Sequence, residues 1–149
     1  MKVVNRVFNR EFEELDKYEA GIQLTGGEVK SALNGGIKLE HSFVKILSGE
    51  AYLFNAEFAP YQFTGKTEYD PVRKRKLLLH KKELIKLQSK IQSGGRLTIV
   101  PIACYTKGRR IKVEIGLVKA RGEVGQKRLE KSRDIKIDQK REIKEYLKQ

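Results

Sequence analysis

The chain is short of the residues from which many functional sites are built. Its 149 residues include one cysteine, two histidines, three prolines and no tryptophan. No apolar run reaches the roughly 18 residues that a membrane-spanning helix needs. Cys104 alone forms neither a disulfide framework nor a cysteine-rich zinc site, and its apolar neighbours predict a buried structural residue. The N-terminus lacks the apolar core of a signal peptide, so we expect a cytoplasmic protein with no membrane partner.

The sequence also lacks a constellation that supports catalysis. His41 and His80 have no Cys or His neighbour at metal-binding spacing, and no glycine pair precedes Lys-Ser or Lys-Thr as in a phosphate-binding loop. The acids of residues 11–16 resemble a carboxylate metal site, but they are interleaved with an expected surface turn, which favours a solvated acidic face. We therefore expect a protein that is not an enzyme and has neither a metal nor a cofactor.

Positive charge is what the sequence has in excess. Lys and Arg number 32 against 19 acids, which gives a formal net charge of +13. Clustered cations gain affinity for phosphates by releasing counterions, so a polyanionic partner is indicated. Residues 70–82 form a basic segment in which six residues are Lys or Arg, with Tyr61, Phe63 and Tyr69 upstream as candidate stacking surfaces. The apolar triplet 77–79 anchors this segment, which favours an ordered RNA surface over a loose loop.

Hydrophobic alternation predicts that most of the chain forms strands. In residues 52–58, Tyr52, Phe54, Ala56 and Phe58 share one face, and a hairpin with residues 42–47 is expected. A second hairpin joins residues 97–105 to 111–117 across the basic turn 107–110, with Lys112 and Glu114 pointing outward. Two further strands at about residues 3–12 and 18–24 bring the expected number to about six.

Helical patterns are scarcer. Residues 28–33 are closed by a glycine cap at 34–36, and residues 81–92 repeat apolar positions at spacings of three and four before Ser93-Gly94-Gly95. Many short strands with few helices predict a mainly β protein, either a small antiparallel barrel or a sandwich. Barrels that bind oligonucleotides are built on such a body.

The composition changes after about residue 118. Residues 119–149 hold 11 Lys or Arg and six acids with scattered apolar residues, which predicts a basic tail that is disordered when free. Lysines recur every four residues, so a helical tail presents one cationic stripe that a phosphate track would stabilise. The alternative is a solvated surface helix. The predicted domains are therefore 1–118, an RNA-binding body, and 119–149, a tail that becomes helical when bound.

Several motifs resemble the SsrA-binding (SmpB) protein family. The most specific is residues 70–84, Asp-Pro-x-Arg-x-Arg-Lys-Leu-Leu-Leu-His-Lys-Lys-Glu-Leu. Asn5-Arg6, residues 18–22 and residues 26–31 are similar to the family's opening, early strand and first helix, and residues 49–55 and 112–117 also match. The resemblance runs from Asn5 to about Leu117. The tail departs from the family's basic pattern, of which only Lys127 and Arg128 are kept clearly.

The resemblance implies a closed antiparallel oligonucleotide-binding-like β-barrel with a few peripheral helices. It implies binding to the tRNA-like domain of transfer-messenger RNA and delivery of that RNA to stalled ribosomes for trans-translation, with a helical tail in the message channel of the small subunit near its decoding region. We expect a monomer. The RNA-binding positions expected from the resemblance and from the basic segments are Asn5, Glu19, Lys30, Arg73, Arg75, Lys76, Leu78, His80, Lys107, Arg109 and Lys112. The expected ribosome-binding tail residues are Lys127, Arg128, Lys136, Lys140, Lys144 and Lys148.

Two residues in this set leave alternatives open. A carboxylate is repelled by phosphates, so Glu19 either accepts hydrogen bonds from base or ribose donors or orients a cation. Leu78 is either an RNA contact or a core leucine. A generic single-stranded nucleic-acid-binding barrel is the rival function, although most Tyr and Phe residues are in core phase. A nuclease is a further rival for which the sequence offers no acid, base or metal set.

Overall fold

The computed structural model describes residues 1–61 and 68–122, and nearly half of these residues lie in strands. The strands are β1 Lys2–Val4, β2 Phe12–Ile22, β3 Ile37–Lys38, β4 Phe43–Leu47, β5 Glu50–Phe54, β6 Glu57–Phe58, β7 Arg75–Leu78, β8 Leu97–Lys107 and β9 Arg110–Ala120. The helices are α1 Phe8–Glu11, α2 Gly26–Leu33 and α3 Lys81–Gln92. The described body is therefore mainly β with three helices.

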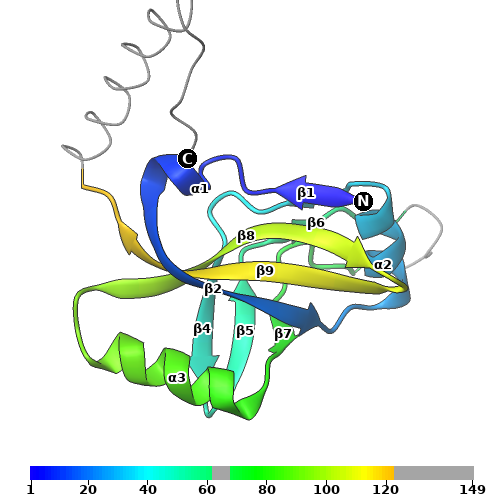
Figure 1. Cartoon of the computed structure of the whole chain (residues 1–149). Coiled ribbons are helices and arrows are strands. Elements are labelled where there is room, and N and C mark those ends of the chain that lie inside the picture. Colours follow the sequence, from blue (N-terminus) through cyan, green and yellow to red (C-terminus); the bar gives the residue numbers. More distant parts are fainter. Residues whose placement is uncertain (62–67, 123–149) are drawn as a thin grey trace, which may run out of the picture.

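Seven strands form one antiparallel sheet in the order β1-β8-β4-β5-β7-β2-β9, and β8 also pairs with β9. The pairings therefore run from β8 through β4, β5, β7, β2 and β9 back to β8. The pairing of β4 with β8 is the shortest in this ring, because it consists of Val44 opposite Ile99 alone. Figure 1 shows β2, β8 and β9 crossing the direction of β4, β5 and β7, with α3 at one end of these three strands. The separate pair β3–β6 completes the strands.

The core lies between the crossing strands. In β9, Val113, Ile115 and Leu117 alternate inward and are fully buried, as the hydrophobic pattern predicts. Strands β5 and β7 contribute Leu53 and Leu77 to the same core cluster. Helix α3 covers one end of this cluster through its buried Leu84 and Leu87. Burial of these large aliphatic groups is the main driving force for the fold.

The sequence predicted the two hairpins and the main helix well. Strands β4 and β5 meet across Ser48 and Gly49, whose positive φ values of 51° and 77° match the turns that join twisted antiparallel strands. Strands β8 and β9 enclose a turn at Gly108, and α3 has the expected bounds. Helix α2 begins two residues earlier than predicted, because Thr25 and Glu28 form a capping box.

The expectation of one continuous strand over residues 52–58 was wrong. Asn55 adopts a positive φ of 62°, so β5 ends at Phe54 and β6 begins at Glu57. This break reverses the faces. Leu53 points into the core, while Tyr52 and Phe54 are half-buried on the outer side. The described residues contain nine strands, of which six form the ring of pairings, as many as the sequence predicted for the body; β1, β3 and β6 are additional.

The N-terminal expectations need a second correction. A strand was predicted over residues 3–12, whereas β1 has three residues and α1 separates it from β2. The acids expected in a surface turn lie instead at the end of α1 and along the first half of β2. Asp16 in β2 accepts a hydrogen bond from Lys90 Nζ at 2.9 Å, which joins this strand to α3. A register shift between Glu14 and Asp16 marks the irregular part of the strand.

Cys104 is buried as predicted, and desolvation raises the pKa of its thiol to about 12. Within residues 1–61 and 68–122, no helix is long and apolar enough to cross a membrane.

Candidate nucleic-acid interface

One row of paired residues crosses five strands. Lys2 of β1 lies opposite Tyr105 of β8, and Tyr105 lies opposite Lys112 of β9. Lys112 lies opposite Gly21 of β2, which in turn lies opposite Leu78 of β7. Directly opposed residues of antiparallel strands project from the same face of a sheet. We call Lys2, Tyr105, Lys112, Gly21 and Leu78 the outer row.

The outer row faces away from the core. Its members Lys112 and Leu78 alternate with Val113 and Leu77, which are fully buried. Leu78 is 49% exposed, so the alternative that it is a core leucine was wrong. The outward direction predicted for Lys112 is confirmed.

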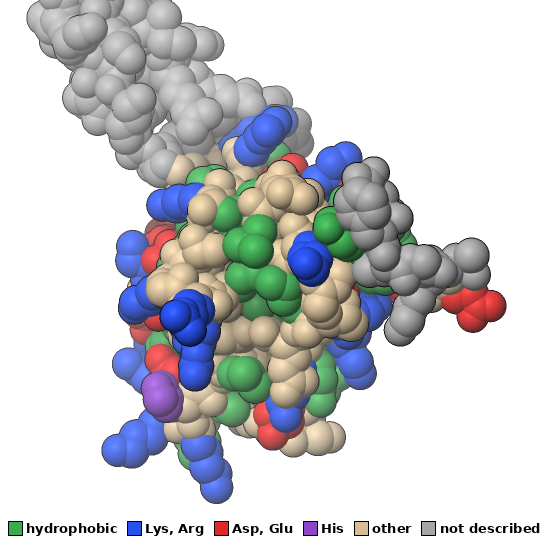
Figure 2. All heavy atoms as spheres, turned by 90° about the vertical axis from the view of Figure 1, so that its right-hand side faces the viewer, with side chains coloured by type: hydrophobic (Ala, Val, Ile, Leu, Met, Phe, Trp, Pro, Cys, Tyr) green, Lys and Arg blue, Asp and Glu red, His purple; other side chains and the backbone are tan. Residues whose placement is uncertain are grey.

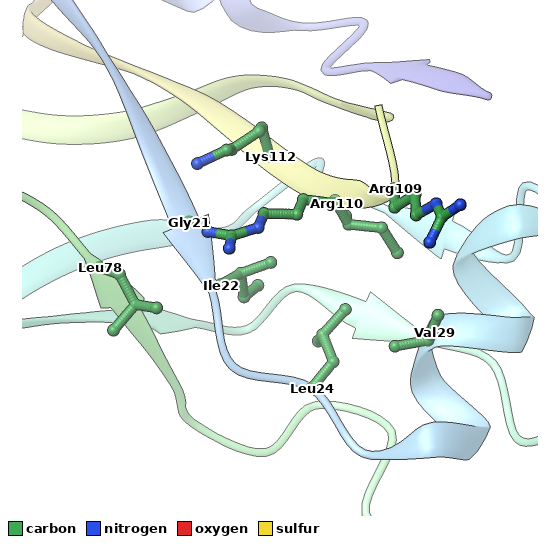
Figure 3. Close-up of a pocket in the computed structure, with 9 residues that line it drawn as sticks. Gly21, Ile22, Leu24, Val29, Leu78, Arg109, Arg110 and Lys112 are labelled. Atoms are coloured by element: carbon green, nitrogen blue, oxygen red, sulfur yellow. The ribbon is translucent and has the colours of Figure 1, made fainter. Parts of the chain in front are cut away.

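A hollow of about 320 Å³ lies beside the outer row. Figure 3 shows Ile22, Leu24, Val29 and Leu78 around its apolar part, with Arg109, Arg110 and Lys112 reaching from the end of the β8–β9 hairpin. The hollow therefore combines an apolar floor with a cationic edge. Such a combination accommodates a base or ribose on the floor and a phosphate at the edge.

Gly21 permits the close approach of β2 and β7 at this point. A Cβ atom at Gly21 would lie 3.3 Å from Leu78 Cβ, which is tighter than an ordinary van der Waals contact. A larger residue would therefore push Leu78 aside and change the floor of the hollow. Gly21 supports the surface through its lack of a side chain.

Glu19 lies two residues before Gly21, and both of its carboxylate oxygens have partners. The Tyr105 hydroxyl donates to Oε2, and Lys107 Nζ lies 3.1 Å from Oε1. The hydrogen bond from Tyr105, followed by that from Lys107, lowers the pKa of Glu19 below its ordinary value. Glu19 pairs with the cation Lys107, which agrees with one of the two roles that the sequence left open and does not exclude the other.

Tyr105 is a residue that sequence reasoning missed. The turn at Gly108 fixes the register of the β8–β9 hairpin, and that register puts Tyr105 directly opposite Lys112. The signal was available, because the turn and both strands were predicted. Arg110 was missed in the same way, although it lines the hollow with Arg109.

Arg75 was expected to contact RNA, and the structure corrects this expectation. Its side chain is fully buried and lies within hydrogen-bonding distance of Glu28, Ala56, Tyr69 and the backbone near Pro71. Nε is 2.8 Å from Glu28 Oε2, and the guanidinium group lies 4.2 Å from the ring centroid of Phe58. The physical reason is alternation, since Arg75 shares the inward face of β7 with Leu77.

Glu28 is the centre of this buried network. It is 1% exposed and accepts hydrogen bonds from Arg73, from Arg75 and from the backbone N–H of Thr25, the residue that caps α2. Burial raises the pKa of the Glu28 carboxyl, but hydrogen bonds from Arg73, the Thr25 backbone and Arg75 outweigh burial and lower it to about 2. The network joins α2 to the segment that leads into β7, so Arg73 is partly committed to the fold as well.

Asn5 was also expected to contact RNA, and the structure assigns its side chain to the fold. The residue is 3% exposed. Its Nδ2 donates to the Pro101 carbonyl at 2.9 Å, and its Oδ1 accepts from the Val7 backbone at 3.2 Å. Asn5 thereby fixes the end of β1 against β8. Direct contact between its side chain and RNA is incompatible with this burial.

The other expected residues spread over neighbouring elements. Lys76 shares the outer face of β7 with Leu78 and lies 3.5 Å from Glu50. His80 is exposed at the start of α3, where its backbone N–H donates to Glu83. Lys30 lies on α2, outside the outer row, and its Nζ is 5.7 Å from the ring centroid of Tyr61. The structure thus brings Glu19, Leu78, Lys107, Arg109 and Lys112 together.

A second outer face combines aromatic and basic side chains. Phe43 and Phe54 stack across β4 and β5 with ring centroids 5.4 Å apart. Lys74 Nζ lies 4.6 Å from the centroid of the Tyr52 ring. The expectation that most aromatic residues are in core phase was wrong for these three rings, which are half-buried. They form a candidate stacking surface.

Positive side chains surround an apolar centre on the face that holds α2 and the β8–β9 turn. Figure 2 shows hydrophobic side chains in the middle of this face and Lys and Arg side chains around them. No group of three His, Cys, Asp or Glu side chains that could hold a metal occurs in the part of the chain that the structure describes. The candidate tail residues Lys127, Arg128, Lys136, Lys140, Lys144 and Lys148 lie outside the described residues, as does Phe63.

A mainly β body with a basic outer row beside an apolar hollow is characteristic of nucleic-acid-binding proteins. The family model described as SmpB protein matches residues 2–145. The chain belongs to the SmpB family, and the resemblance found in the sequence is confirmed.

Curated relatives match almost the whole chain. The SsrA-binding protein of Persephonella marina is 43% identical over 150 residues, which cover 99% of this chain and 98% of the relative. That of Sulfurihydrogenibium sp. is 45% identical over 144 residues, covering 97% of this chain and 94% of the relative. A solved chain described as "tmRNA-SmpB: a journey to the center of the bacterial ribosome" is 42% identical to this chain and superposes on it with a TM-score of 0.68. The similarity covers 82% of this chain and 85% of that chain.

Proposed function

We propose that this protein binds the tRNA-like domain of transfer-messenger RNA (SsrA) and delivers it to stalled ribosomes, where incomplete nascent chains are tagged by trans-translation. Support comes from membership of the SmpB family over residues 2–145 and from relatives described as SsrA-binding proteins. The observation on this chain that carries the proposal is the outer row, in which Lys112 lies between Tyr105 and Gly21 with Leu78 at its end.

The RNA surface proposed here is centred on the hollow. Lys112, Lys107 and Arg109 supply cations for phosphates, Leu78 supplies apolar contact, and Glu19 holds Lys107 in place. Lys76 and His80 extend this surface along β7 toward α3, and Lys30 and Arg73 extend it toward α2. A rigid sheet is suited to this task, because side chains fixed by strand pairing lose little freedom on binding.

We also propose the finer architecture and domain organisation. The ring of pairings from β8 through β4, β5, β7, β2 and β9 supports a closed oligonucleotide-binding-like barrel. Strand β9 extends to Ala120, and the Arg121 backbone N–H donates to Glu11 O at 2.8 Å, which supports a body that includes residues 119–121 in addition to the predicted 1–118. The basic remainder is the tail that becomes helical in the message channel of the ribosome, near the decoding region of the small subunit.

We propose that the protein acts by binding RNA and does not catalyse a reaction. It works in the cytoplasm as a monomer without a cofactor. The basic composition supports a role in RNA binding, and the sequence shows no recognisable set of catalytic residues. The tail residues that are proposed to meet ribosomal RNA are the lysine stripe at 136, 140, 144 and 148, preceded by Lys127 and Arg128.

Competition binding tests the proposal. Labelled tRNA-like domain of transfer-messenger RNA is bound to the full chain and displaced by unlabelled tRNA-like RNA or by unstructured single strands of the same length. The proposal expects the tRNA-like RNA to compete far better, and expects the RNA to stay intact when divalent metal is added. Preferential binding of single strands would instead favour a generic single-strand-binding protein that uses Phe43, Tyr52 and Phe54. Cleaved RNA would indicate a nuclease.

A further inference from the structure

Glu19 introduces negative charge into a cationic surface. On β2 it lies directly opposite Glu114 of β9, and like charges in that position repel each other. Two side chains of β8 compensate for this repulsion. The Tyr105 hydroxyl donates to one carboxylate oxygen, and Lys107 Nζ lies 3.1 Å from the other. The fold therefore maintains an acidic position at the edge of the proposed RNA surface.

Tyr105 connects this acidic position to the outer row. It lies opposite Lys112 in the sheet and its hydroxyl donates to Glu19, so it links the proposed phosphate-binding lysine to a carboxylate. Burial and the hydrogen bond to Glu19 raise the pKa of the Tyr105 hydroxyl, which therefore stays neutral and keeps donating to Glu19. Since its only proton is directed at Glu19, the hydroxyl oxygen can act toward any further partner only as an acceptor.

The remaining hydrogen-bonding capacity of Glu19 and Tyr105 is that of acceptors, whereas Lys107 keeps N–H donors for other partners. A carboxylate offers about four lone-pair sites. Glu19 uses one oxygen for Tyr105 and the other for Lys107, and about a third of its side chain is accessible. A phosphate is not a partner for these acceptors, because it is negative and has no proton to donate, and it is left to Lys107 and Lys112. A nucleic acid seated on Lys112 offers donors only from its sugars and base edges.

We infer that Glu19 and Tyr105 form an acceptor site for a hydrogen-bond donor of the bound RNA, and that Tyr105 is an RNA-contacting residue that Glu19 and Lys107 hold in position. The donor is a ribose 2′-hydroxyl or the guanine 2-amine, the two donors that the shallow groove of an RNA helix displays. The inference rests on the RNA-binding function proposed above. It assigns to this cluster a role in selecting RNA features, alongside the affinity supplied by the cations.

The test uses the full chain and three versions of the tRNA-like RNA. One RNA is unmodified, one set carries 2′-deoxy residues in successive blocks, and one set carries inosine in place of guanosine and so lacks the 2-amine. The proteins are wild type, Tyr105→Phe, Glu19→Gln and the control Glu14→Gln, which makes the same charge change at an exposed position of the same strand. Melting temperatures verify that each variant is folded.

On unmodified RNA, Tyr105→Phe and Glu19→Gln are each expected to weaken binding about three- to tenfold, the effect of losing one hydrogen bond. The control should bind as wild type does. One modified RNA should weaken wild-type binding by a similar factor while changing the two variants little, because the donor and its acceptor are lost together. Coupling to a 2′-deoxy block identifies the ribose as the source, and coupling to inosine identifies the base.

Two results would overturn the inference: variants that bind unmodified RNA as tightly as wild type, or modifications that weaken wild type and variants equally. Wild-type protein that binds the unmodified tRNA-like RNA no better than a single strand would overturn the proposed function, and the inference with it. That failure is visible in wild type alone, so it is distinguishable from failure of the acceptor site.

Discussion

Leu77 and Leu78 are neighbours in β7 but lie on opposite faces, with exposures of 1% and 49%. Leu77→Ala should lower the free energy of unfolding by about 2–5 kcal/mol, because it leaves a cavity in the core. Leu78→Ala should lower it by less than about 1 kcal/mol, since the side chain is at the surface. The expected effect of Leu78→Ala is severalfold weaker RNA binding. Urea unfolding and RNA titration test the two variants. Normal RNA binding by a folded Leu78→Ala protein would show that Leu78 is not part of the RNA-binding surface.

Lys112→Ala should weaken binding to the tRNA-like RNA while leaving the melting temperature nearly unchanged. Lys112 is a half-buried residue of the outer face, and its ammonium group is proposed to contact a phosphate. Loss of one phosphate contact should reduce the slope of log affinity against log salt by about one. Lys86→Ala on the exposed side of α3 is the matched control. An unchanged salt slope for Lys112→Ala would contradict the phosphate assignment.

Glu28 should make the stability of the body depend on pH in the acid range. Its pKa is about 2 in the folded protein against an ordinary value of 4.5. Its ionised form is therefore favoured by folding, so this contribution is fully present above pH 4.5 and is lost as the pH falls toward 2. A depression of this size corresponds to about 3 kcal/mol at neutral pH. Glu28→Gln should remove it.

The measurement is urea unfolding of wild type and Glu28→Gln between pH 7 and pH 3. The difference in the free energy of unfolding should be largest at pH 7 and should shrink as the pH falls below 4.5. Glu14→Gln, which alters an exposed carboxylate of β2, controls for general charge effects. A difference that stays constant over the whole range would show that the buried ion pairs do not supply this stability.

Arg75→Lys should destabilise the protein although it keeps the positive charge. The guanidinium donates to Glu28 and to backbone carbonyls in several directions, and a lysine ammonium cannot match that planar geometry. Lys74→Arg, one residue away and exposed, should have no comparable effect. Thermal melting compares the two variants. Equal melting temperatures would contradict the structural role assigned to Arg75.

Local patterns predicted the elements that depend on local chemistry. Helix α3 and the turns at Gly49 and Gly108 were predicted because apolar periodicity and glycine act within a few residues. The break at Asn55 was missed because alternation alone does not reveal a positive φ, although Asn adopts that conformation more readily than most residues. Helix α1 was missed because its four residues are too few for a periodic signal.

Site residues were predicted correctly where alternation along one strand decides whether a side chain faces outward. They were predicted wrongly where a partner far away in the sequence decides whether the side chain is buried. Lys112 follows from alternation in β9. The burial of Arg75 depends on Glu28, which lies 47 residues away in the chain, and no local pattern reveals that partner. Alternation with Leu77 did indicate the inward face of Arg75, but the charge of a four-residue basic run favoured the surface. Asn5 was misassigned for the same reason, since its partner Pro101 lies on β8.

Truncation after Gly122 should separate two functions. The proposed RNA contacts lie before the cut, and the last backbone hydrogen bond of the body, from Arg121 to Glu11, is retained. The truncated protein should therefore bind the tRNA-like RNA nearly as well as the full chain. Lys140→Glu with Lys144→Glu in the full chain reverses charge while keeping good helix formers, and should also leave RNA binding almost intact. Strong loss of binding in either protein would place the tail within the RNA site.

Tagging of a nascent chain on a ribosome stalled without a stop codon is the measurement that decides whether this protein brings transfer-messenger RNA to stalled ribosomes. The reaction is reconstituted with transfer-messenger RNA and either the full chain, the Lys112→Ala protein or the protein truncated after Gly122. We expect efficient tagging with the full chain, reduced tagging with Lys112→Ala that is restored at higher protein concentration, and none with the truncated protein even when it is bound to RNA. Absence of tagging with the full chain would show that the protein does not rescue stalled ribosomes, and full tagging by the truncated protein would show that rescue does not need the tail.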